Sequence, residues 1–329
     1  MPMTHPATAR WIVVLMLVLG ACRGGDAVDE TDDGEKAAPD LEVPALPDFG
    51  PMGDLQPEAG GEAWATGVGF KDREEYRVRL IQTAHSEVPG RAPMEHRVRQ
   101  EFTLVREVIS RDAGLTRLML RIQDVTFTPL GPDGEPTPTP PQMASFAPTL
   151  ERVEVHLAMD ERGRIQELEV AKASNLPRGM EDLFHQLVRD LQVTLPPDAA
   201  SPGTSWVDAG ELPVEREKSR NIVRWSLAGT YRGTVDRSGV RCAMVEIEGK
   251  LEEEGWVDRK EIRGTVEGRG RVRKVALMEA DTGRLVELRM VSALARRVTY
   301  GKESREKARI EELTMELSLQ AGTADEENQ

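Results

Sequence analysis

Apolar and polar residues alternate along most of the chain, and this alternation predicts β-strands. In Tyr76-Arg-Val-Arg-Leu80, for example, apolar residues alternate with arginines, as expected where successive side chains point to opposite faces of a strand. Further runs with the same character cover residues 98–108, 115–127, 153–159, 165–171, 222–235, 240–247, 256–266, 271–278, 285–294 and 310–319. The pattern predicts a mainly β (α+β) fold, an antiparallel, curved sheet or half-barrel of about 10 strands.

One segment has a helical period instead. Apolar residues recur three and four positions apart from Met180 to Leu191, which predicts one amphipathic helix packed on the concave face of the sheet. The residues expected to form an apolar core or to line an apolar cavity are Leu183, Phe184, Leu187 and Leu191. A partner-binding helix or a helix lying on a membrane would show the same stripe. Residues 129–148 contain seven prolines, and we expect an extended loop there.

The N-terminus carries an apolar segment with the length of a signal peptide. Arg10 precedes the apolar residues 11–19, a run shorter than the roughly 20 residues that a transmembrane helix needs. The sequence continues as Leu19-Gly20-Ala21-Cys22, which resembles the lipobox of bacterial lipoproteins. The resemblance implies that residues 1–21 are removed and that Cys22 carries a lipid. A secretory signal with a coincidental cysteine and an uncleaved anchor are the alternatives.

The lipobox resemblance also implies a place in the bacterial cell envelope. The residue after Cys22 is Arg23 rather than the aspartate that retains many lipoproteins in the inner membrane, and this favours the outer membrane. Two or more acyl chains anchor a protein stably without a transmembrane helix. The expected partner is therefore the membrane, through the lipid anchor on Cys22, and a lipid or an envelope protein is a further candidate.

The uneven distribution of charge divides the chain into a body and two tails. The net charge is −14, but residues 23–63 hold 12 acidic against two basic residues, whereas residues 64–321 hold 42 acidic and 40 basic ones. We expect an acidic disordered tether over 22–63, a β-rich globular domain over 64–321 and an acidic disordered tail over 322–329. Because neither the net charge nor the tails supply a basic face for phosphates, nucleic acid is not an expected partner.

Sequence motifs that carry catalysis or metal binding are absent. The histidines lack metal-ligand spacing, and no Walker loop, dinucleotide glycine fingerprint or Gly-x-Ser-x-Gly motif occurs. Cys242, the second of two cysteines, lies in an apolar strand-like segment, where a small buried residue is a better interpretation than a nucleophile. A pair of catalytic carboxylates would leave no spacing to recognise. We expect no enzyme, no cofactor and no metal.

Three short motifs of the body are the Gly163-Arg-Ile-Gln-Glu-Leu168 hairpin, the Leu195-Pro196 pair after the helix, and Pro202-Gly-Thr-Ser-Trp206. In these motifs the body resembles a domain family of unknown function found in bacterial envelope lipoproteins. More distantly, the arrangement resembles the curved half-barrel of lipoprotein carriers, in which a sheet wraps around helices and holds acyl chains. These resemblances imply a fold and a location in the cell envelope, and they supply no catalytic residue.

Two questions stay open in the sequence. Residues 153–173 and 273–293 match at an offset of 120, each reading strand, Gly-Arg turn, strand. This pattern indicates either a duplication, with halves 64–200 and 201–321, or two unrelated hairpins. The second open question is the function. We expect a non-catalytic interaction or structural lipoprotein. The alternative is a binding or carrier module for a lipid or other hydrophobic ligand held between the sheet and the helix.

Overall fold

The computed structural model describes most of the chain between residues 41 and 322. Within this range, the residues not described are 51, 53–54, 59–62, 66, 89–91, 113, 172–179, 217–218, 260–261 and 301–306. The predicted signal peptide, Cys22 and the tether up to residue 40 lie outside the described residues, as does the predicted tail from residue 323.

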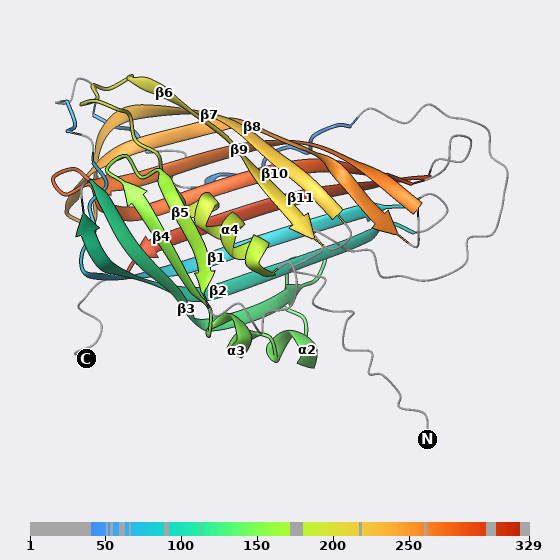
Figure 1. Ribbon diagram of the computed structural model, residues 1–329. Coiled ribbons are helices and arrows are strands. Elements are labelled where there is room, and N and C mark those ends of the chain that lie inside the picture. The colour runs from blue at the N-terminus through green and yellow to red at the C-terminus, as the bar shows by residue number, and fades with distance from the viewer. Residues whose placement is uncertain are drawn as a thin grey trace.

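Eleven antiparallel strands form one curved sheet that does not close (Figure 1). The strands are β1 (Arg73–Glu87), β2 (Met94–Asp112), β3 (Leu115–Leu130), β4 (Glu154–Asp160), β5 (Ile165–Ala171), β6 (Ser205–Arg216), β7 (Ser219–Arg237), β8 (Val240–Arg259), β9 (Ile262–Glu279), β10 (Leu285–Tyr300) and β11 (Lys307–Ala321). Their order is β5-β4-β3-β2-β1-β11-β10-β9-β8-β7-β6, so the first and last strands pair in the middle and β5 and β6 are the edges. The predicted mainly antiparallel β fold is confirmed.

The sequence pattern misplaced two strand boundaries. The predicted strand over 256–266 is wrong, because β8 continues to Arg259 and β9 begins at Ile262. Three consecutive glutamates interrupt the apolar alternation in the sequence of β8. Their burial nevertheless alternates as in the rest of the strand, because Glu252 and Glu254 are exposed and Glu253 is buried. Strand β6 was not predicted, since its glutamates and Pro213 hide the alternation. An edge strand tolerates proline because one side of its backbone needs no partner.

The prediction of a single helix is wrong, because the described residues contain three. They are α2 (Pro141–Ala144), α3 (Ala147–Leu150) and α4 (Met180–Leu191). Both α2 and α3 lie at the end of the segment expected to be an extended loop, and a proline occupies the first turn of each, where its missing N–H costs no hydrogen bond. Met143 and Leu150 anchor the two short helices in the main hydrophobic cluster.

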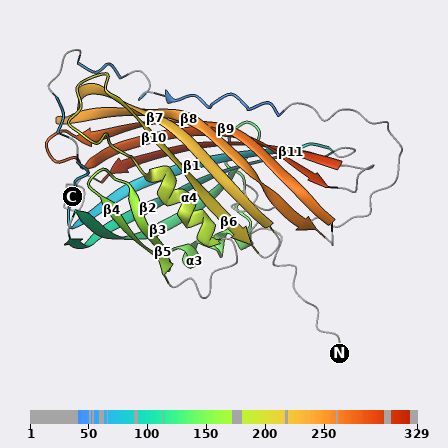
Figure 2. The ribbon, with the colours of Figure 1, turned by 45° about the horizontal axis from the view of Figure 1, so that its top comes forward.

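The main hydrophobic cluster covers the inner, concave face of the sheet. It extends across both halves of the chain, from Tyr76 and Leu118 to Tyr231 and Leu317. Both views show α4 on this side of the sheet (Figures 1 and 2). Its side chains Phe184 and Val188 are buried members of the same cluster.

A second hydrophobic cluster lies on the outer face, where residues from the predicted tether cover the sheet. Leu46, Phe49, Met52 and Leu55, which we call the strap, pack against Val235, Cys242, Met244, Val275, Leu277, Val286 and Val291. The expectation that the tether extends to residue 63 is therefore corrected: Phe49 and Met52 are only 6% and 4% exposed. The strap residues recur every third position, a period that matches a polyproline or 3₁₀ segment and differs from the periods of 2 and 3.6 that identify strands and α-helices.

The turns of the two hairpins that match in sequence are bonded to the same short segment of the chain. Each turn contains a glycine with positive φ, 76° at Gly163 and 68° at Gly283. The Val68 N–H donates to the Glu161 carbonyl at 2.9 Å, and the Gly69 N–H donates to the Gly283 carbonyl at 3.0 Å. One short segment therefore bridges both turns, while the duplication itself stays a prediction.

Candidate functional site

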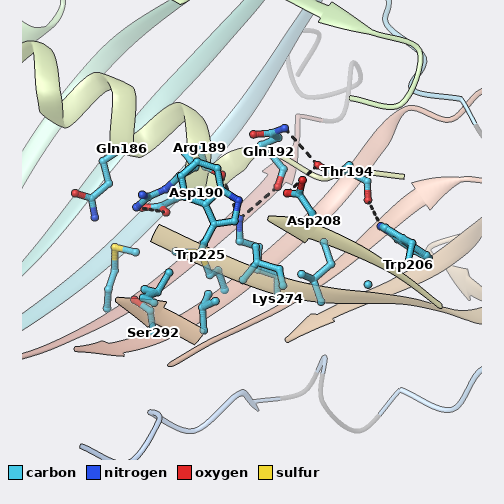
Figure 3. A pocket seen from close by; sticks show the side chains of 17 residues that line it. Gln186, Arg189, Asp190, Gln192, Thr194, Trp206, Asp208, Trp225, Lys274 and Ser292 are labelled. Atoms are coloured by element: carbon cyan, nitrogen blue, oxygen red, sulfur yellow. Dashed lines mark hydrogen bonds and ion pairs between the residues drawn. The ribbon is translucent and has the colours of Figure 1, made fainter. Parts of the chain in front are cut away.

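A small cavity lies between α4 and the sheet (Figure 3). Its volume is about 50 Å³, which is room for about three to five water molecules. The lining residues from α4 and the segment after it are Gln186, Arg189, Asp190, Gln192 and Thr194. Those from strands β6 to β11 are Trp206, Asp208, Trp225, Leu227, Gly229, Ile247, Leu251, Val272, Lys274, Met290, Ser292 and Met315. Polar groups thus gather on the helix side of a largely apolar floor.

Lys274 is a buried cation that ties the end of α4 to the sheet. It projects from β9 between Val272 and Ala276, which belong to the main cluster. Its Nζ donates to the carbonyl oxygens of Arg189 at 3.2 Å and Gln192 at 3.3 Å. Carbonyl groups at a helix C-terminus lack intrahelical partners and carry partial negative charge, which a cation complements. Burial lowers the pKa of Lys274 to about 8, although Asp190 acts in the opposite direction.

Arg189 and Asp190 approach Lys274 from α4 (Figure 3). Arg189 Nη2 lies 3.6 Å from Asp190 Oδ1, and the guanidinium carbon lies 5.5 Å from the centroid of the Trp225 ring. Burial raises the pKa of Asp190, against the opposing effects of Arg189 and Lys274. Arg189 Nη1 is buried and has no hydrogen-bond partner among the described residues. The site therefore holds two cations and an unused buried donor.

Two tryptophans line the cavity, Trp206 on the edge strand β6 and Trp225 on its neighbour β7. Trp206 pairs in register with Gly229, and Trp225 pairs with Gly210. A Cβ at Gly229 would lie 2.3 Å from the Trp206 ring, and one at Gly210 would lie 2.5 Å from the Trp225 ring. Only glycine lets each indole lie against the opposite strand. The Trp206 Nε1–H also donates to the Thr194 carbonyl at 2.9 Å, which fixes the chain just after α4.

Of the four residues that the sequence proposed for a core or a cavity, the three with described side chains belong to the core or pack against it, and they do not line this cavity. Phe184 is buried in the main cluster, and Leu187 and Leu191 are half-buried against it. The side chain of Leu183 lies outside the described part of the structure. The α4 residues that do line the cavity are the polar Gln186, Arg189 and Asp190, which lie outside the apolar stripe.

The cysteine and metal expectations concern other parts of the molecule. Cys22 lies outside the described residues, while Cys242 is fully buried beneath the strap, and burial raises the pKa of its thiol to about 11.

Among the described residues, no three His, Cys, Asp or Glu side chains form a group that could hold a metal ion. In the same part of the chain, no helix has both the length and the apolar character to cross a membrane.

Comparison with known proteins gives only distant likenesses. No family model and no curated protein matches the chain. The hypothetical lipoprotein YmcC from Escherichia coli matches 72% of this chain and 85% of its own, with 11% identity and a TM-score of 0.20. A loop-deletion mutant of OmpT, an outer membrane protein of Vibrio cholerae, matches 75% and 100%, with 9% identity and a TM-score of 0.23. The LolA superfamily protein NE2245 from Nitrosomonas europaea matches 79% and 91%, with 8% identity and a TM-score of 0.13. Scores this low assign the chain to none of these folds.

Proposed function

We propose that the protein is a non-catalytic cell-envelope lipoprotein, anchored in the outer membrane through a lipid on Cys22. The support is the Leu19-Gly20-Ala21-Cys22 sequence behind a short apolar segment. A body of near-neutral charge on an acidic linker fits a protein held at a membrane by its lipid rather than by surface charge.

We further propose that the body binds a lipid or another hydrophobic molecule between α4 and the sheet. The observation that carries this proposal is the cavity itself, which combines buried polar groups on α4 with half-buried apolar side chains, Trp225, Leu251 and Met315, on the floor. Ligand sites typically combine apolar walls with a few placed polar groups. Because the volume is about 50 Å³, the cavity accepts a headgroup, and a long chain must lie along the concave face beside α4.

Native mass spectrometry of the mature chain tests this proposal. The full chain from residue 22 carries Cys22→Ser, so that no covalent lipid contributes, and is purified without detergent. We expect a co-purified mass that is lost when Trp225→Ala removes part of the floor, and retained in Val207→Ala, whose side chain is exposed. A protein without any bound mass that also fails to bind an added fluorescent amphiphile would contradict the binding proposal. It would favour the interaction or structural role.

A further inference from the structure

We propose that the cavity selects ligands with an oxyanion, a carboxylate or a phosphate, which Arg189 and Lys274 bind together. This inference rests on the proposed binding function and adds the chemical class of the ligand. It starts from the hydrogen-bond donors at the cavity, because buried donors on charged groups are costly to leave without an acceptor.

The donors of both cations are incompletely used. The Lys274 ammonium has three N–H donors, and its hydrogen bonds to Arg189 and Gln192 occupy two of them. Arg189 Nη1 carries two more N–H groups, is buried, and has no partner among the described residues. Both residues line the same cavity. An acceptor placed there completes the bonding of both side chains.

The donors on the two cations bind an ionised acceptor more strongly than a neutral one. The positive charge of Arg189 lowers the pKa of Lys274, so the two charges lie close together. Two carboxylates line the cavity as well and offset the cations: Asp190 lies 3.6 Å from Arg189 Nη2, and both Asp190 and Asp208 raise the pKa of Lys274. Neither accepts a hydrogen bond from Arg189 Nη1, which has no partner among the described residues. Hydrogen bonds from ionised donors to an ionised acceptor are roughly twice as strong as neutral ones.

The cavity size and its surroundings define the rest of the ligand. A volume of about 50 Å³ accommodates a carboxylate or a phosphate group and excludes an acyl chain. Beyond Arg189 the floor continues through Trp225, Leu251 and Met315, which are half-buried and apolar. An amphiphile with its oxyanion at the two cations would therefore lay its chain over these residues.

Matched ligands separate this inference from the binding function. Tryptophan fluorescence of the mature chain from residue 22 is titrated with dodecanoate, dodecyl phosphate and the neutral methyl dodecanoate, at equal concentrations below micelle formation. We expect at least one anion to bind at least about tenfold more tightly than the ester, a factor that a single charge-assisted hydrogen bond already supplies. The better anion shows whether a carboxylate or a phosphate is preferred. Equal binding of anions and ester would overturn the inference and leave the binding proposal standing, whereas binding of none would refute the binding proposal.

Variants then identify the groups that discriminate. Arg189→Met and Lys274→Met are each expected to bring the affinity for the preferred anion to the level of the ester. Lys250→Met is the control, because Lys250 is exposed on β8 and its loss leaves the preference unchanged. Since Lys274 also bonds the end of α4, its variant could lose structure. The comparison of ligands on the wild-type chain needs no variant and stays decisive in that case. An undiminished preference in a folded Arg189→Met protein would also contradict the proposed contact.

Discussion

Replacing Phe49 with alanine tests whether the strap belongs to the folded body. Phe49 is 6% exposed and its ring lies against two guanidinium groups, 4.7 Å from that of Arg273 and 5.9 Å from that of Arg289. A buried Phe→Ala change costs about 3–5 kcal/mol, and a cation–π contact adds about 0.5–1 kcal/mol. Arg289 Nη2 also donates a hydrogen bond to the Asp48 carbonyl at 3.2 Å.

Because no further stability can be lost once the strap has detached, these magnitudes are an upper limit. We therefore expect the free energy of unfolding to fall by up to about 3–5 kcal/mol. Detachment also uncovers Cys242, whose pKa burial raises to about 11 from an ordinary 9.0. At pH 8 a return to the ordinary pKa increases the thiolate fraction about a hundredfold.

Two measurements on the same variant check this prediction. Urea denaturation gives the change in stability, and the rate of reaction with a disulfide reagent at pH 8 reports the exposure of Cys242. The control is Val207→Ala, because Val207 is 64% exposed and surface changes stay within about 0.5 kcal/mol. A Phe49→Ala protein with the wild-type denaturation midpoint and an unreactive thiol would refute the docked strap.

Three further predictions concern the helix, the buried lysine and the anchor. Phe184→Ala should lower the free energy of unfolding, measured by urea denaturation, by about 3–5 kcal/mol, and Leu187→Ala should lower it clearly less because Leu187 is half-buried. Small and equal losses in the two variants would show that Phe184 is not in the core. Because the pKa of Lys274 is about 8 in the folded protein and 10.5 as its ordinary value, the unfolded chain binds one more proton between these pH values. Stability should therefore rise with pH by up to about 3 kcal/mol over that interval, a slope measured by denaturation at pH 8, 9 and 10 and absent from Lys274→Met. Cys22→Ala should abolish palmitate labelling of the full chain and leave unprocessed precursor; persistent labelling would contradict the anchor.

The sheet could be predicted from the sequence because every second residue of a half-buried strand faces the core and is apolar. The prediction failed where charge masks that signal, as in β6 and around Glu253. Glu253 is buried because it forms an ion pair with Arg296, which also lies 3.5 Å from Glu311. The three residues belong to different strands, so no local pattern distinguishes this glutamate from its exposed neighbours.

The strap was missed for a different physical reason. Acidic residues and prolines make up eight of the 18 residues 41–58, and a high content of both is typical of disorder. Burial at this segment depends on four apolar residues at a spacing of three, matched by an apolar patch on the outer face of β7 to β10. The patch exists only after the sheet has formed, and a single strand in the sequence does not show which of its two faces another segment covers.

The cavity could not be predicted, because its charges come together only through the tertiary structure. Arg189 and Lys274 are 85 residues apart, on a helix and on a strand, and each alone has the appearance of an ordinary surface residue. One part of the site did leave a signal: the Pro202-Gly-Thr-Ser-Trp206 motif. Trp206 fills the space above Gly229 and bonds the Thr194 carbonyl, while Lys274 bonds the Gln192 carbonyl two residues earlier. The motif therefore fixes the exit of α4, and with it the position of Arg189 over the cavity.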